Sequence, residues 1–180
     1  MQRRKFLIGT GAAAVGAVNP TLAAPSIRPE QSLRRVVVTT DGEGSRVLAD
    51  GAPTNAFELN GTKIMRLWET SAVPTSLPVD VDAGVTAGSA YREGFAGTSF
   101  YVAEIPPGVG RQQIPMHRND TLDYMAILEG EIHLVLPDRE ILLQQGDTLI
   151  QVGVMHTWEN RGDELCRLLF VVVPGQRDDR

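Results

Sequence analysis

Apolar and polar residues alternate in short runs along most of the chain after residue 33, whereas apolar residues at helical spacing are confined to the N-terminal stretch. Runs rich in β-branched, aliphatic and aromatic residues predict strands. The expected strands are Val36–Thr40, Lys63–Trp68, Ser99–Ile105, Asp123–Leu128, Ile132–Leu136, Glu140–Leu143, Thr148–Val152 and Leu165–Val173. Turn signals such as Asn60-Gly61 separate them, so the pattern predicts an all-β sandwich or barrel.

Two segments depart from this pattern. Residues 24–33 are polar with two prolines and predict an extended arm. Residues 70–98 are rich in Pro, Asp and Gly, and they predict a long loop, or a lid over the mouth of a barrel. No internal repeat is present, so we expect one domain. Its predicted parts are residues 24–98 (arm, edge strands and long loop), 99–174 (barrel core) and 175–180 (tail).

The N-terminus has the features of an export signal. Gln2–Lys5 is basic, Phe6–Val18 is apolar, and small residues follow at Thr21–Ala24. The apolar run is shorter than the about 20 residues of a membrane-spanning helix. Arg3-Arg4 ahead of an apolar run resembles a twin-arginine signal, and an ordinary secretory signal or an uncleaved anchor is the alternative. We expect residues 1–23 to direct a periplasmic or secreted protein.

Charge excludes some partners. The net charge is −5 at pH 7, and removal of residues 1–23 leaves 14 basic against 22 acidic residues, a net charge of −8. Such a surface repels phosphate backbones, so we expect no nucleic-acid partner. No later apolar stretch has transmembrane length, so we expect no membrane association after signal removal. The lone Cys166 lies in an apolar run and is interpreted as a buried structural thiol.

Histidine and acidic residues gather in one part of the chain. His117 and Asn119 are two residues apart, as are His156 and Trp158, so each pair shares one face of a strand. Asp123 returns to the face of His117 if that strand continues or bends. Two imidazoles and one carboxylate are a ligand set expected for Fe(II), Mn, Ni or Zn.

The spacing of this block resembles the two motifs of the cupin superfamily. The block has two halves. The first ends at a glycine, and the second begins at Gly146-Asp147 and continues to His156 and Asn160. The segment His-Arg-Asn-Asp-Thr-Leu-Asp-Tyr is similar to the corresponding motif of a recurrent small-cupin subfamily. The likeness covers roughly residues 33–174. The resemblance implies a single-domain, RmlC-like jelly-roll β-barrel with an N-terminal arm. It also implies a metal held by His117, Asp123 and His156.

Two departures from the family pattern weaken that ligand set. Asn119 stands where the first motif has a second His, and it is a weak neutral ligand at best. Asp123 replaces the usual Glu and has a shorter reach. The expected cofactor is therefore a divalent metal of uncertain occupancy, with no organic cofactor. For His133, in the predicted strand Ile132–Leu136, a structural role is favoured.

The alternation of side chains along the strands also predicts which residues line the pocket. Met125 shares a face with Asp123, Trp158 shares one with His156, and Tyr101 or Phe100 would form the opposite wall. Met125 and Trp158 would alternatively only fill the core. A small organic ligand suits such a pocket.

Three functions stay open. The first is a metal-dependent lyase, isomerase, decarboxylase or dioxygenase, and the second is a metal-free sensor or carrier without turnover. The third is a metal-free acid–base enzyme that uses His117 or His156 as its proton carrier. The resemblance to small cupins, which commonly form dimers through edge strands, implies a homodimer. Val36–Thr40 would be a suitable edge strand for that contact.

Overall fold

The computed structural model describes residues 33–85 and 95–177. The predicted export signal and most of the N-terminal arm lie outside these residues. The described chain is almost entirely β-structure, with a single short 3-10 turn, η1. Its strands are β1 (Arg35–Asp41), β2 (Gly44–Gly51), β3 (Asn55–Leu59), β4 (Thr62–Glu69), β5 (Ser99–Ile105), β6 (Thr121–Glu129), β7 (Glu131–Val135), β8 (Glu140–Gln144), β9 (Thr148–Val152), β10 (Thr157–Glu159) and β11 (Cys166–Pro174), and η1 spans Ala83–Val85.

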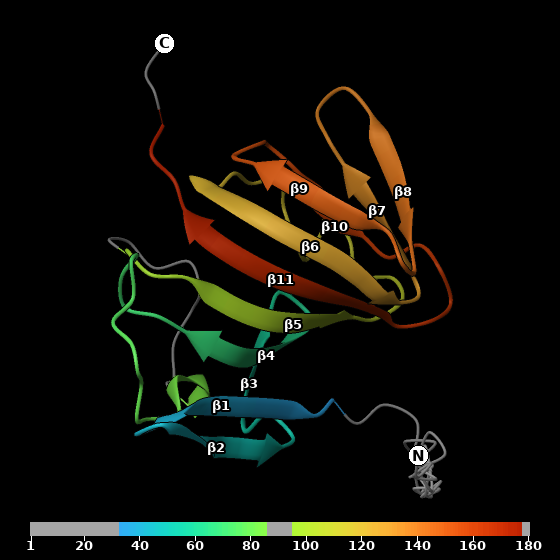
Figure 1. The fold of residues 1–180 in the computed structure, drawn as a ribbon. Helices are drawn as coiled ribbons and strands as arrows, with labels where there is room; N and C mark the ends of the chain where they lie inside the picture. The colour runs from blue at the N-terminus through green and yellow to red at the C-terminus, as the bar shows by residue number, and fades with distance from the viewer. Residues whose placement is uncertain (1–32, 86–94, 178–180) are drawn as a thin grey trace, which may run out of the picture. The chain divides into compact units, whose positions relative to one another are not determined.

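The strands form a jelly-roll barrel. One sheet has six strands in the order β3-β4-β5-β11-β6-β9, and a second has three in the order β10-β7-β8 (Figure 1). All of the paired strands are antiparallel. β11, the last strand, lies between β5 and β6, so strands far apart in sequence close the barrel. The prediction of an all-β barrel is therefore confirmed.

Strict alternation along β11 explains the position of the core. Cys166, Leu168, Phe170 and Val172 are buried on one face, and the residues between them are more exposed. They join inward-facing residues of both sheets in one continuous apolar core, which includes Ile132 of β7. Burial of this face drives the closure of the barrel.

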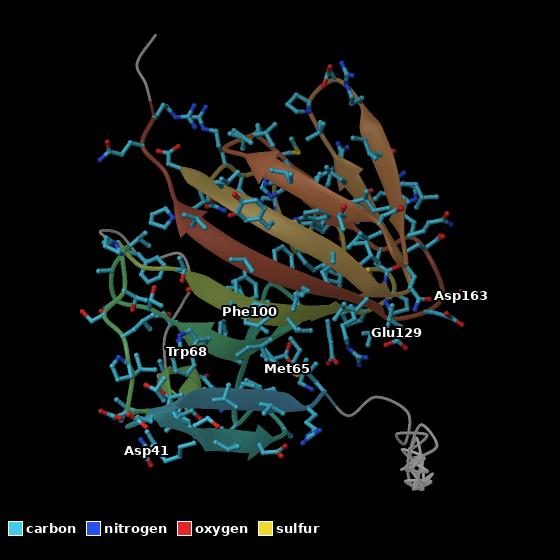
Figure 2. All side chains as sticks on the ribbon, in the orientation of Figure 1. Asp41, Met65, Trp68, Phe100, Glu129 and Asp163 are labelled. Atoms are coloured by element: carbon cyan, nitrogen blue, oxygen red, sulfur yellow. The ribbon has the colours of Figure 1, made fainter. Side chains whose placement is uncertain are left out.

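The outer face of the large sheet is partly covered. Met65, Leu67 and Val102 form a second buried cluster, against which Leu33 and Phe100 pack. Figure 2 shows Met65 on the side of β4 that faces β1. β1 pairs only with β2, as a separate two-stranded sheet. The expected homodimer and the role of this edge strand remain predictions.

The β3–β4 hairpin turns through Asn60-Gly61, and both residues have positive φ, 53° and 77°. Two successive residues of positive φ are typical of a type I′ turn, which matches the twist of the strands it joins. The turn was predicted from this dipeptide. It positions Leu59 and Thr62 at one end of the cavity described below.

All eight predicted strands are present, with small differences at their ends. The prediction missed β2, β3 and β10. Because β3 and β4 join the six-stranded sheet, the barrel also includes residues that had been assigned to the segment before residue 99.

The long-loop prediction for residues 70–98 agrees with what the structure describes. Residues 70–85 contain bends and η1, which packs against β4. None of the described loop residues lines the cavity, so the structure gives no support for a lid; residues 86–94 lie outside the described part. In the described ranges, no helix has the length and apolar character needed to cross a membrane.

Candidate functional site

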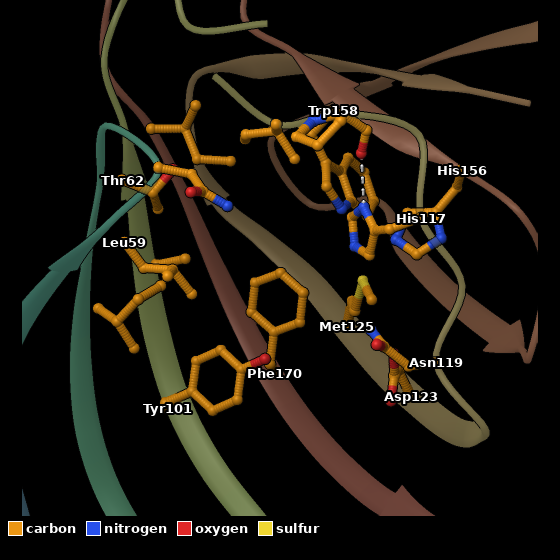
Figure 3. Close-up of a pocket in the computed structure, with 16 residues that line it drawn as sticks. Leu59, Thr62, Tyr101, His117, Asn119, Asp123, Met125, His156, Trp158 and Phe170 are labelled. Atoms are coloured by element: carbon orange, nitrogen blue, oxygen red, sulfur yellow. Dashed lines mark hydrogen bonds between the residues drawn. The ribbon is translucent and has the colours of Figure 1, made fainter. Parts of the chain in front are cut away.

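A cavity of about 320 Å³ opens inside the barrel between the two sheets. Every residue predicted for the site lines it: His117, Asn119, Asp123, Met125, His156, Trp158 and Tyr101 (Figure 3). Phe100, the alternative to Tyr101, faces the other side of the sheet and packs in the second cluster. His133 is outside the cavity lining, on β7.

The two cavity histidines are joined through their backbones. His117 N–H donates to the carbonyl of His156, and His156 N–H donates to the carbonyl of His117, both at 2.9 Å. This isolated bridge replaces the continuous strand that was expected around His117. It holds the two rings with their centroids 4.3 Å apart at an angle of 51°.

Backbone carbonyls determine which ring nitrogen carries the proton. Nδ1 of His117 lies 2.9 Å from the carbonyl of Pro115, and Nδ1 of His156 lies 2.9 Å from that of Val154. A carbonyl only accepts, so a neutral ring in either position carries its proton on Nδ1. Nε2 of each neutral ring is therefore an acceptor.

Gln151 makes the two imidazoles unequal. Its side-chain amide nitrogen lies 2.8 Å from Nδ1 and 2.9 Å from Nε2 of His156, and Nε2 is the nitrogen able to accept from it. Burial lowers the pKa of His156 to about 4, so its ring is neutral at pH 7. His117 is only half-buried and has no such amide neighbour among the hydrogen bonds described.

Sequence reasoning missed Gln151 beside His156, and also Thr62 and Phe170 in the cavity lining. Gln151 is buried on β9, an edge strand that reaches the site only through tertiary packing. The available signal was its position between Gly146-Asp147 and His156, in the second half of the block that resembles the cupin motifs.

Asp123 is the one acid of the cavity lining. It comes from β6 and is 1% exposed, and its Oδ1 has no hydrogen-bond partner in the described residues. Burial raises the pKa of this carboxyl to about 6, while a hydrogen bond from Thr121 and the charge of His117 act in the opposite direction. A buried carboxyl oxygen without a partner is costly, and a ligand donor would relieve that cost.

Three aromatic rings form part of the remaining wall, together with aliphatic side chains. Tyr101 and Phe170 stack with centroids 5.0 Å apart and planes 12° apart. Trp158 meets Phe170 and His156 edge-on, with centroids 6.5 and 5.8 Å apart. Met125 is both a core residue and a cavity residue, so its two interpretations are compatible. The cavity is therefore mostly apolar, with polar side chains near the histidines and at Asn60 and Thr62.

The donor set does not fit a firmly held divalent metal in this arrangement. In residues 33–85 and 95–177, no three His, Cys, Asp or Glu side chains are grouped so that they could hold an ion. The N–H group of the Gln151 amide, the positive end of its dipole, lies beside both nitrogens of His156 and would repel a cation. His117, Asp123 and His156 all line the cavity, and their metal role, like that of Asn119, remains a prediction.

Comparison with known proteins adds the family. Residues 101–172 match the family model Cupin_2, described as a cupin domain. The fold is similar to that of the Schizosaccharomyces pombe Cnp3 cupin domain, with a TM-score of 0.50 and 14% identity. The likeness covers 80% of this chain and 89% of that one. The family match covers the barrel core from β5 to β11, and the structural likeness shows the fold.

The curated relatives match at higher identity than the Cnp3 cupin domain but over a smaller share of the chain. Phomopsin biosynthesis cluster protein C' of Diaporthe leptostromiformis is 35% identical over 79 residues, which are 43% of this chain and 40% of that protein. The cupin-domain-containing oxidoreductase srdD of Neurospora crassa is 27% identical over 142 residues, 73% of this chain and 70% of that protein. The chain thus spans about two fifths of the length of the first of these relatives.

Proposed function

We propose that this barrel is an enzyme that moves a proton within a small, neutral and mostly apolar organic molecule. One observation carries the proposal: an apolar cavity of about 320 Å³ has, at one end, an imidazole with an available Nε2 and a buried carboxyl oxygen without a partner. The volume is at the small end of the roughly 300–1,000 Å³ typical of ligand sites. It suits a molecule of about one ring.

His117 is the proton carrier in this proposal. Its Nδ1 is held by the Pro115 carbonyl, so Nε2 is the nitrogen able to accept a proton from the ligand. His156 is a poor carrier because it is buried and both of its nitrogens have neighbours. His156 instead fixes the backbone of His117 through their mutual hydrogen bonds.

Such a reaction balances without a redox partner. Nε2 of His117 takes a proton from a carbon next to a carbonyl, and an enolate forms. Return of that proton to oxygen or to another carbon of the same molecule gives an isomer. Asp123, whose Oδ1 has no partner in the described residues, would accept a hydrogen bond from the O–H group of the enol.

Metal-dependent oxidation is the second candidate. Relatives such as srdD are named cupin-domain-containing oxidoreductases, which favours it, at 27% identity. It requires Gln151 to move away from His156 and Asp123 to approach both imidazoles. A sensor or carrier without turnover is the third candidate, since the same cavity serves binding alone.

The test is deuterium exchange from solvent into neutral one-ring ketones, with phenylacetone as the first probe, followed by proton NMR. We expect the wild-type chain to accelerate loss of the α-proton signal and His117→Gln to abolish the acceleration. His133→Gln is the matched control, because His133 lies on β7 outside the cavity lining. It should leave the exchange rate unchanged.

Metal content separates the candidates. The purified protein is analysed for bound metal before and after anaerobic incubation with Fe(II), Mn(II), Ni(II) or Zn(II). Exchange that persists in a chelator supports the proposal. Stoichiometric metal, with activity only in its presence, would favour the oxidoreductase, and saturable binding without exchange would favour the carrier.

A further inference from the structure

The cavity has a second polar position that the proposed chemistry does not use. Thr62, the first residue of β4, lines the cavity and is 5% exposed, and its Oγ1 has no hydrogen-bond partner in the described structure. Most buried hydroxyl groups in proteins have a partner, and one without a partner is costly. Nothing in the packing of β4 requires a hydroxyl at this position.

Thr62 lies far from the histidines. In Figure 3 it is near Leu59 at one side of the cavity, while His117 and His156 are at the other, and the rings of Tyr101 and Phe170 lie lower in the view. Side chains so separated in projection are also separated in space. The cavity therefore has polar groups at two ends and aromatic rings in its wall.

The β3–β4 hairpin holds the backbone of Thr62 in place, while its side chain can still rotate. Thr62 follows directly after the Asn60-Gly61 turn, and its backbone pairs with Leu59 across the hairpin. Thr has staggered χ1 rotamers that exchange the places of its hydroxyl and methyl groups. A rotation about a single bond is enough to direct Oγ1 at a ligand in the cavity.

We propose that the ligand is a flat, one-ring molecule with two polar ends: an enolisable carbonyl at His117 and a hydroxyl or carbonyl group at the Thr62 end. This inference rests on the proposed function, since it specifies the substrate class of the same cavity. The ring lies against Phe170 and Trp158, whose edge-on packing presents apolar surface.

Two probes that differ in one hydroxyl test the second end. Phenylacetone and 4-hydroxyphenylacetone carry the same ketone, and only the second has a group able to reach Thr62. We expect the wild-type protein to bind the hydroxylated probe about tenfold more tightly, as roughly one additional hydrogen bond implies. Isothermal titration or ligand-observed NMR measures both dissociation constants.

Variants assign the preference to the hydroxyl of Thr62. Thr62→Val keeps the shape and removes the hydroxyl, so the two probes should bind equally and phenylacetone should bind as it does to wild type. Thr62→Ser restores the hydroxyl and should restore the preference. Without ligand, Thr62→Val should be at least as stable as wild type to urea, because it removes a buried hydroxyl without a partner.

The outcomes are distinguishable. Equal wild-type affinity for both probes, or a preference that survives in Thr62→Val, overturns the two-ended ligand and leaves the proposed function intact. Destabilisation by Thr62→Val in the absence of ligand would assign the hydroxyl a structural role and also overturn the inference. Failure of every variant to bind either probe would overturn the proposed function together with this inference.

Discussion

At the scale of single residues, identical side chains acquire different properties from their surroundings. His117 and His156 pair through the same backbone bridge and direct Nδ1 at equivalent carbonyls two residues back. Burial and the neighbouring amide of Gln151 keep His156 neutral, whereas His117 keeps an available Nε2 at the cavity. The proposed division between a positioning histidine and a reacting histidine is thus argued from their environments, not from residue type.

Asn160 shows the same dependence on environment in a structural role. It is 1% exposed, donates from Nδ2 to the carbonyls of Ile105 at 2.8 Å and Glu164 at 2.9 Å, and accepts from Gly162 N–H at 3.1 Å. These bonds join the end of β10 to the end of β5 and to the loop before β11. The side chain uses its full amide, both donor and acceptor.

Asn160→Asp should destabilise the barrel. A carboxylate of the same size still accepts from Gly162 but cannot donate to the two carbonyls, so we expect a loss of about 2–4 kcal/mol in the free energy of unfolding. Urea denaturation followed by tryptophan fluorescence measures it. Gln145→Glu, the same exchange at an exposed residue, is the control and should change little. Equal stability of the two variants would contradict the assigned role.

At the scale of elements, an ion pair attaches β1, which is outside the two sheets of the barrel, to the rest of the structure. Arg35 of β1 binds Asp82 through Nη1 and Nη2, at 2.6 and 2.5 Å, and also donates to the carbonyl of Leu67 at 3.1 Å. The pair is largely shielded, with side-chain exposures of 9% and 20%. One guanidinium thus ties β1 to β4 and to the segment before η1.

Asp82→Asn should loosen this attachment. We expect a loss of about 1–3 kcal/mol in the free energy of unfolding, because the charge of Arg35 would remain part-buried without its counter-charge. The matched control is Asp50→Asn, which breaks a similar bidentate pair with Arg34 that is exposed on both sides and should contribute little. A comparable loss in both variants would contradict the argument from burial.

The pH dependence has a definite sign. The hydrogen bond from Arg35 lowers the pKa of the Asp82 carboxyl below its ordinary 3.8. A carboxyl with a lowered folded-state pKa contributes stability that is fully present above the unfolded pKa and is lost as pH falls through the folded value. The difference in stability between wild type and Asp82→Asn should therefore be constant from pH 5 to 7 and decrease below about pH 4.

At the scale of the whole molecule, the sequence pattern was sufficient to predict the barrel and part of the cavity lining, but not every strand or every cavity residue. β2 was missed because most of its residues are exposed, and β10 because it has only three residues. The inward-facing Arg66 lies in a predicted strand, yet nothing in its neighbours along the chain indicates that it is 1% exposed. Burial of a polar residue depends on tertiary partners, which a single sequence does not display.

The fold and its one thiol also suit export in the folded state. Closure of the barrel requires β11 to insert between β5 and β6, so the core is complete only when the whole described chain has paired. Cys166 is buried and free, as expected, and burial raises the pKa of its thiol to about 12, so it is inert at neutral pH. With one cysteine, the chain needs no internal disulfide in any compartment.

These properties give the twin-arginine prediction a direct test. In a bacterial host, Arg3→Lys with Arg4→Lys should retain the protein in the cytoplasm as a folded precursor, because that route requires the arginine pair and accepts folded cargo. Cell fractionation and immunoblotting measure precursor and exported protein. Arg34→Lys, an exposed arginine of the barrel segment, is the control and should export normally. Export that survives the double substitution but stops when the general secretory pathway is inhibited would instead identify an ordinary secretory signal, and the barrel would then have to fold outside the cytoplasm.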